Sequence, residues 1–221
     1  MKKLVLSLAL VATVTFAFGQ KKVVKEAEKG LKSGNLQTAL TAIDAATTNP
    51  ETSGDPATFL VKAKIHTKIF ASDSSNTKET LEAGNQALAT FNKTFEMAGS
   101  SKTSPVGKEV YADELPGIPD NIRPYSLITL KNISFDKALE RYNEDDMEMS
   151  YEFFNLAGEI DKTDSTIHYN AGFLANDLGR FEDAKKHFNY LFELPTYNKT
   201  NAYYKKKLHE MQRRKAGVYS L

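Results

Sequence analysis

The 221-residue sequence contains no cysteine and no tryptophan. The lack of cysteine excludes disulfides and thiolate metal sites, so no covalent cross-link can stabilise the fold. Hydrophobic residues make up 41% of the chain, which is enough for a single core or for a stacked repeat array. We therefore expect a protein that is held together by the packing of its apolar side chains.

Long hydrophobic runs are also missing, with one exception at the amino terminus. Two lysines precede an apolar run over residues 4–16, and the small residues Ala17 and Gly19 follow it. A short basic start, an apolar run of this length and small residues at both ends of a triplet are typical of a secretory signal peptide. The pattern predicts a signal peptide over 1–19, with cleavage before Gln20.

A membrane anchor is the alternative interpretation of this segment. The run is too short to span a hydrocarbon core of about 30 Å comfortably, and a cleavage site ends it. No cysteine follows the run, so a lipoprotein-type lipid anchor is excluded. We expect an exported protein without membrane insertion after cleavage, located in the periplasm or, alternatively, secreted or associated with the outer membrane.

Charge of one sign is not in excess over the whole chain. Loss of the two N-terminal lysines with the signal peptide leaves 27 basic and 28 acidic residues, a net charge of −1. Nucleic-acid binding favours a basic field, so no nucleic-acid partner is expected. Residues 140–164 nevertheless hold nine acids and two bases, and residues 199–215 hold seven Lys or Arg and one Glu. These segments are ordinary solvated helix faces, or surfaces that meet different partners or each other in a neighbouring copy.

The sequence marks of a catalytic or cofactor site are absent too. There is no GxSxG, P-loop or GxGxxG motif, and the four histidines, at 66, 168, 187 and 209, form no HExxH motif. The stretch NEDDMEMSYE lacks the glycine and the alternating ligands of a calcium loop. We expect no enzyme activity, no cofactor and no metal site.

A 34-residue periodicity is the most informative feature that is present. Three pairs of residues share this offset, namely Ser150 and Ala184, Phe154 and Phe188, and Ala138 and Gly172. A period of 34 residues is that of the tetratricopeptide repeat, a helix-turn-helix unit. The repeats therefore predict two consecutive helical hairpins over 131–164 and 165–198.

The stretch GRFEDAKKHFNYLFELP fits the second of these hairpins. We expect its first helix over 165–178, ended by Gly179, which is free to take a positive φ. Gly172 and Ala184 are small, which lets the two helices approach each other closely. Pro195 is expected to end the second helix because it cannot continue the helical hydrogen bonds.

The same pattern is found near the amino terminus. A helix over 21–32 precedes GNLQTALTAIDAATTNP, which has a glycine at the turn and a proline at its end. The next helix is predicted to begin at Asp55, where Asp serves as the cap and the following Pro takes the first helical position. Its partner is predicted over 78–97, after an expanded turn at 72–77.

These residues resemble the tetratricopeptide repeat (TPR) family, closely over 131–198 and loosely over 21–98. The chain looks most like exported TPR proteins of Bacteroidota, which carry a similar KKVVKEAEKGLKSGNLQTAL opening after the signal. It departs from the family pattern at Ser150, where Ala is usual, and at the 72–77 insertion. The resemblance implies an all-α fold, a solenoid of TPR-type helical hairpins with a long inserted loop.

The inserted loop is residues 99–124, which hold four of the seven prolines and three of the twelve glycines. A regular helix pair is excluded there, although a short helical turn could form over 108–115. We expect an ordered insertion packed on the repeats, with a flexible linker as the alternative, because six apolar residues need burial. These residues are Val106, Val110, Tyr111, Leu115, Ile118 and Ile122.

The insertion divides the expected domain organisation. N-terminal TPR-like hairpins occupy 20–98, and C-terminal repeats occupy 125–221, beginning with a long helix over 125–143. The Lys- and Arg-rich residues 199–213 are predicted to form a terminal capping helix.

The resemblance also implies a binding groove, lined by the first helix of each hairpin. Carried over to this sequence, the groove residues are Asn132, Phe135, Leu139, Tyr142, Asn143, Thr166, Tyr169, Phe173, Asn176 and Asp177, with Tyr203 and Lys207 from the last helix. Asn side chains can pair with a peptide backbone and aromatic rings can give apolar contact, although some of these rings could belong to the core. The Lys, Asn, Asn, Lys and Arg pattern of a carboxylate clamp is not present.

We therefore expect a non-catalytic exported scaffold that binds a protein or peptide partner through this groove. The alternative is a structural subunit of a cell-envelope assembly, joined through its helix ends and the 99–124 insertion. The oligomeric state is left open by the sequence.

Overall fold

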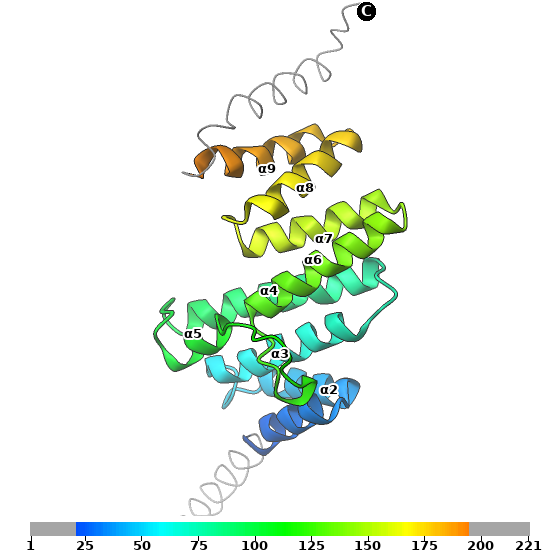
Figure 1. Cartoon of the computed structure of the whole chain (residues 1–221). Coiled ribbons are helices and arrows are strands. Elements are labelled where there is room, and N and C mark those ends of the chain that lie inside the picture. Colours follow the sequence, from blue (N-terminus) through cyan, green and yellow to red (C-terminus); the bar gives the residue numbers. More distant parts are fainter. Residues whose placement is uncertain (1–20, 195–221) are drawn as a thin grey trace, which may run out of the picture. The chain divides into compact units, whose positions relative to one another are not determined.

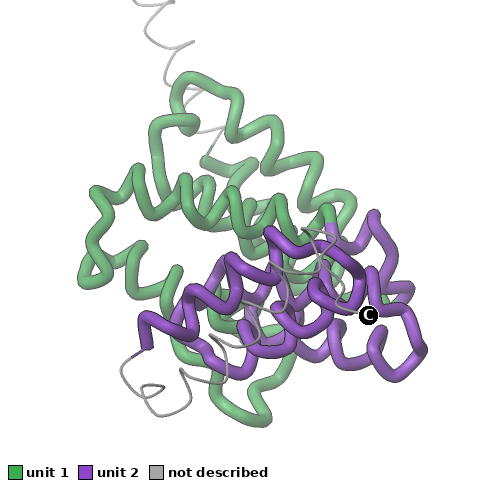
Figure 2. Tube along the Cα trace, turned by 90° about the horizontal axis from the view of Figure 1, so that it is seen from above, with its two compact units in different colours: residues 1–74, 82–130 green, residues 75–81, 131–221 purple. Residues whose placement is uncertain are grey.

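A computed structural model describes residues 21–194, and every regular element among them is a helix (Figure 1). The expected all-α fold of helical hairpins is therefore confirmed. The described residues divide into two compact units (Figure 2). Unit 1 consists of residues 21–74 and 82–130, and unit 2 consists of residues 75–81 and 131–194. The signal peptide and the capping helix lie outside the described residues, and the expected domain boundaries stay predictions.

Unit 1 begins with a helix over residues 21–33. It continues with α2 (Leu36–Thr48), α3 (Pro56–Ser72), α4 (Lys78–Met97) from residue 82 on, α5 (Pro105–Val110) and the short 3₁₀ helix η1 (Asp120–Ile122). The predicted helices over 21–32 and 78–97 and the helix start at Asp55 are confirmed. In the first hairpin, a Cβ atom on Gly30 would lie 2.8 Å from the Cβ of Ala39, so the two helices are in close contact there.

The core of the first hairpins is built from small and branched residues. Ala27, Ala39, Ile43, Ala46, Val61 and Ile65 form one buried cluster. Helix α3 is placed by its cap, since the Asp55 Oδ1 accepts a hydrogen bond of 2.9 Å from the backbone N–H of Ala57. The proline that follows needs no helical hydrogen-bond partner, so the sequence at this point both starts and stabilises the helix.

The insertion contains α5 and η1, and its apolar residues are not all buried. Val110 is fully buried, and the Tyr111 ring packs edge to face on Phe95 with 5.1 Å between centroids. Leu115 and Ile122, however, are 63% and 66% exposed, so the expectation that they are buried is wrong. The helical turn is α5, at 105–110 instead of 108–115, because the Ser104 hydroxyl caps it by accepting from the N–H of Gly107.

Unit 2 contains α6 (Leu127–Asn143) from residue 131 on, α7 (Met147–Ile160), α8 (Ser165–Asp177) and α9 (Phe181–Glu193). Consecutive helices α7, α8 and α9 pack on one another. The segment 75–81 joins this unit through Asn76, which donates to Glu140 at 2.6 Å and accepts from Lys137 at 2.6 Å. The long helix expected over 125–143 is confirmed and begins two residues later.

The contacts inside the hairpins explain the 34-residue pattern. A Cβ atom on Gly172 would lie 2.9 Å from the Cε1 and Cζ atoms of Phe188, so only glycine allows α8 and α9 to approach this closely. Ser150 is at a position where alanine is usual. Its buried hydroxyl is not left without a hydrogen bond, because it donates to the Ala138 carbonyl at 2.8 Å. Gly179 has a φ of 75°, as expected for the residue that ends α8.

Candidate partner-binding groove

An apolar groove of about 230 Å³ lies between α6 and α8 of unit 2. Its lining residues are Leu139, Tyr142, Phe154, Tyr169, Asn170, Phe173 and Leu174. Asn170 is the single member of this set with a fully polar side chain. The groove can therefore offer apolar contact to a ligand, with two tyrosine hydroxyls and one amide as hydrogen-bonding groups.

The groove gathers most of the exposed apolar side chains of the described residues. Six large hydrophobic residues are exposed between residues 21 and 194, and four of them line this groove. These four are Leu139, Tyr142, Tyr169 and Phe173, with exposed fractions of 38–44%. Single exposed hydrophobic residues are common on protein surfaces, but a contiguous apolar patch is a mark of an interaction site.

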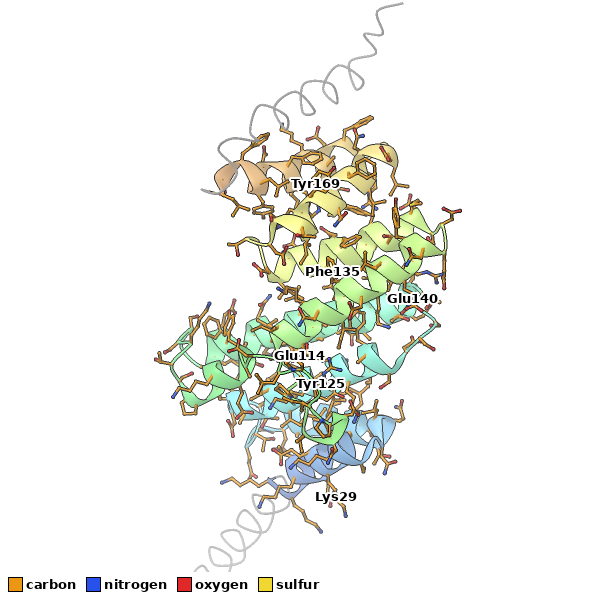
Figure 3. The ribbon with its side chains drawn as sticks, in the orientation of Figure 1. Lys29, Glu114, Tyr125, Phe135, Glu140 and Tyr169 are labelled. Atoms are coloured by element: carbon orange, nitrogen blue, oxygen red, sulfur yellow. The ribbon has the colours of Figure 1, made fainter. Side chains whose placement is uncertain are left out.

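Helix periodicity positions the rings on α8. Tyr169, labelled in Figure 3, is one turn before Phe173. The two rings stack with 6.5 Å between centroids and an interplanar angle of 17°. At the floor of the groove, Phe154 of α7 is in edge-to-face contact with Phe135, with 5.5 Å between the ring centroids. Because Phe154 is buried, the groove has a rigid apolar floor beneath exposed walls.

The structure brings together only part of the predicted groove residues. Leu139, Tyr142, Tyr169 and Phe173 line the groove, whereas Phe135 packs on Phe154 and supports the floor. Asn132, Asn143, Thr166, Asn176 and Asp177 do not line it. Asn176 donates to the carboxylate of Asp177 at 3.2 Å, so these two side chains contact each other. Tyr203 and Lys207 lie outside the described residues.

Three lining residues were not predicted from the sequence, namely Phe154, Asn170 and Leu174. Phe154 was assigned to helix packing because it matches Phe188 in the repeat. Asn170 and Leu174 directly follow Tyr169 and Phe173 in the sequence. Their place on the neighbouring row of α8 could have indicated that they also line the groove. Phe154 is on α7, the second helix of its hairpin, and it lines the groove between α6 and α8. A helical wheel does not show that its ring reaches there.

The opposite side of α8 is fixed to α9 by two buried histidines. The Nδ1 atoms of His168 and His187 are 3.0 Å apart, so one ring donates its Nδ1 proton to the other, whose own proton is then on Nε2. Burial lowers the pKa of both imidazoles, and for His187 the charge of His168 adds to the effect and brings the pKa to about 4. The pair is therefore neutral near pH 7.

Unit 1 contains a second, charged cavity of about 300 Å³ beside the insertion. The buried Lys68 forms an ion pair of 2.7 Å with Asp120 there and donates to the Leu31 carbonyl at 3.2 Å. The Lys68 ammonium and the Tyr125 hydroxyl both donate to Asp120, which lowers the pKa of this carboxyl group. Figure 3 labels Tyr125 and Glu114, and Glu114 pairs with Arg123. These charges neutralise one another, so the cluster attaches the insertion to the helices.

Within residues 21–194, no three His, Asp or Glu side chains are placed to hold a metal ion. None of the described helices combines the length and the apolar character needed to cross a lipid bilayer.

Comparison with known proteins gives a limited result. No family model matches the sequence, and no curated protein matches it either. Among solved structures, MamA AMB-1 is similar at 18% identity, with 79% of this chain and 98% of that chain covered and a TM-score of 0.27. A mutant of MamA is similar at 15% identity, with 80% and 98% covered and a TM-score of 0.27. A TM-score this low does not establish a shared arrangement, so the fold rests on the helices of this chain.

Proposed function

We propose that this chain is an exported, non-catalytic TPR-type scaffold, of the kind found in Bacteroidota, that binds a protein or peptide partner through the groove of unit 2. The observation that carries the proposal is the gathering of Leu139, Tyr142, Tyr169 and Phe173 on one groove. Exposing these side chains to water costs free energy that a bound partner would recover by covering them.

The size of the groove supports a peptide segment over a small-molecule ligand. Pockets for small molecules usually measure about 300–1,000 Å³ and enclose most of the ligand. The groove here measures about 230 Å³, and its walls are exposed to solvent. One or two apolar side chains of an extended segment fit such a space.

The experiment is affinity capture of partners from envelope extract with the mature chain and with a Tyr169→Ala/Phe173→Ala variant. We expect a partner captured by the wild type to be lost in the variant, and thermal unfolding of the variant checks that it still folds. The matched control is Leu115→Ala/Ile122→Ala, which removes two exposed apolar side chains outside the groove.

The control also tests the alternative, a structural subunit of an envelope assembly joined through the insertion. The exposure of Leu115 and Ile122 favours this alternative, since both are apolar and lie in the insertion. Capture that persists in the groove variant but fails in the insertion variant would contradict the groove proposal and support the assembly role.

A further inference from the structure

We propose that the partner segment accepted by the groove is cationic, with an apolar side chain flanked by Lys or Arg residues. This inference rests on the proposed function of the groove and adds the chemistry of the partner.

The two units differ strongly in charge. The described residues of unit 2 carry 15 acidic and 8 basic side chains, a net charge of −7. Those of unit 1 carry 12 acidic and 12 basic side chains and are neutral. The negative charge is thus a property of the unit that holds the groove.

Acidic side chains extend along both helices that form the groove walls. On α8, Asp177 is exposed one turn after Phe173, and the helix contains no Lys or Arg. On α6, Asp136 and Glu140 are exposed and follow Phe135 and Leu139 directly. Asp177 therefore lies on the same face of α8 as Phe173. Asp136 and Glu140 lie about 100° further around α6 than Phe135 and Leu139, at the edge of the groove wall, and Glu140 also accepts a hydrogen bond of 2.6 Å from Asn76.

The basic side chains of the α6 wall are already held by neighbouring groups. Lys131 pairs with Asp161 at 3.2 Å and Asp164 at 3.6 Å. Arg141 pairs with Glu144 and with Asp146. Lys137 is buried and donates to Asn76 at 2.6 Å. Because these cations have partners within unit 2 and the unit has a net charge of −7, the net charge that an incoming segment meets is negative, which favours a cationic segment.

The division of roles follows from general energetics. Apolar contact in the groove supplies most of the affinity, while exposed charge pairs add little each and act mainly on association rate and on partner choice. Exposed charge interactions are screened by salt, with a Debye length of about 10 Å at 0.1 M. The preference for a cationic segment should therefore decrease at high ionic strength.

The test is fluorescence anisotropy with the full mature chain and three labelled peptides. Each peptide has the same length, and a Leu-Tyr centre is flanked by Lys, by Glu or by Ser. We expect the Lys-flanked peptide to bind about tenfold more tightly than the Glu-flanked peptide at 50 mM NaCl, and the ratio to fall to about twofold at 500 mM.

Two variants, each with three carboxylates replaced, show which acidic residues cause the preference for the Lys-flanked peptide. Asp136→Asn/Glu140→Gln/Asp177→Asn removes three carboxylates beside the groove, and we expect it to abolish the preference among peptides. Glu148→Gln/Glu182→Gln/Glu193→Gln removes three carboxylates from α7 and α9, and we expect it to keep most of the preference.

The outcomes separate this inference from the proposed function. Equal binding of all three peptides, lost in Tyr169→Ala/Phe173→Ala, would overturn the cationic preference and leave the groove as the site. No binding of the Lys-flanked peptide at about 1 mM would also overturn the inference. A Kd above about 1 mM is too weak for a specific site. Binding that survives in Tyr169→Ala/Phe173→Ala would contradict the groove itself.

Discussion

At the scale of single residues, the buried histidine pair is the least ordinary feature of unit 2. His168 and His187 share one proton, and their Nε2 atoms are buried without a hydrogen-bond partner in the structure. One further proton on either ring would place a positive charge in a site enclosed by Gly158, Tyr151 and Tyr190. The pair therefore couples the stability of the α8–α9 contact to pH.

The first prediction concerns this pH dependence. Burial lowers the pKa of His187 from 6.5 to about 4 in the folded protein, so the unfolded state binds more protons below pH 6.5. Stability is therefore complete above about pH 6.5 and decreases as the pH falls toward 4. From this histidine alone, the free energy of unfolding should decrease by about 2 kcal/mol between pH 7 and pH 5.

Urea unfolding at the two pH values measures the effect, with His187→Gln as the comparison. The variant should lose about 2 kcal/mol less than the wild type between pH 7 and pH 5. The carboxyl group of Asp161, whose pKa is lowered by hydrogen bonds from Thr163 and Lys131, is present in both proteins and cancels in the difference. Equal losses in the two proteins would show that His187 is not held neutral by burial.

At the scale of elements, the helices are positioned by their termini. Asp55, Asp146 and Asp164 each accept a backbone hydrogen bond at the start of α3, α7 and α8. Gly34 and Gly179 have positive φ values at hairpin turns, where other residues would be strained. Caps and turns of this kind make each hairpin a local structure that neighbouring hairpins can pack against.

The second prediction follows for the cap of α3. Asp55→Ala removes the acceptor of the Ala57 N–H and should lower the free energy of unfolding by about 1 kcal/mol. Asp55→Asn keeps an acceptor oxygen and should lower the free energy of unfolding by only about 0.3 kcal/mol. Chemical denaturation of the two variants gives the measurement, and equal losses would mean that charge, not the cap, is what Asp55 contributes.

At the scale of the whole molecule, acidic and basic residues are nearly equal in number, but they are not evenly distributed along the chain. Unit 2 is strongly acidic, while residues 199–215, outside the described residues, are strongly basic. Near-neutrality of the full chain therefore conceals one acidic unit with an exposed apolar groove. A charged partner would therefore be attracted to one unit more than to the other, and the net charge of the whole chain does not reveal this difference.

The third prediction concerns processing and location. If residues 1–19 are a signal peptide, the full chain expressed in an export-competent bacterium should appear in the periplasm with a mass that begins at Gln20. Replacing the small residues by Ala17→Tyr/Gly19→Tyr should block cleavage and keep the chain in the membrane fraction. Wild-type protein of full length in the membrane fraction would support the anchor interpretation instead.

Part of the groove was predictable because the resemblance to TPR proteins implies a lining from the first helix of each hairpin. The 34-residue offset between Phe154 and Phe188 predicts two hairpins, and helix periodicity then places Tyr169 and Phe173 on the same face. Asn176 and Asp177 follow the same periodicity but contact each other outside the groove. Periodicity gives the direction of a side chain and not the depth or extent of the groove, so the lining could be predicted only in part.

The sequence by itself determined the class of fold, the start of α3 at Asp55 and the small residues at helix contacts. Each of these follows from hydrogen-bond caps, backbone freedom and the 3.6-residue period, which act over a few neighbouring residues. Only the tertiary structure decided that Leu115 and Ile122 are exposed, that Phe154 forms the floor of the groove and that two histidines share a proton. These features depend on which residues meet across helices, and such contacts are set by the packing of the whole unit.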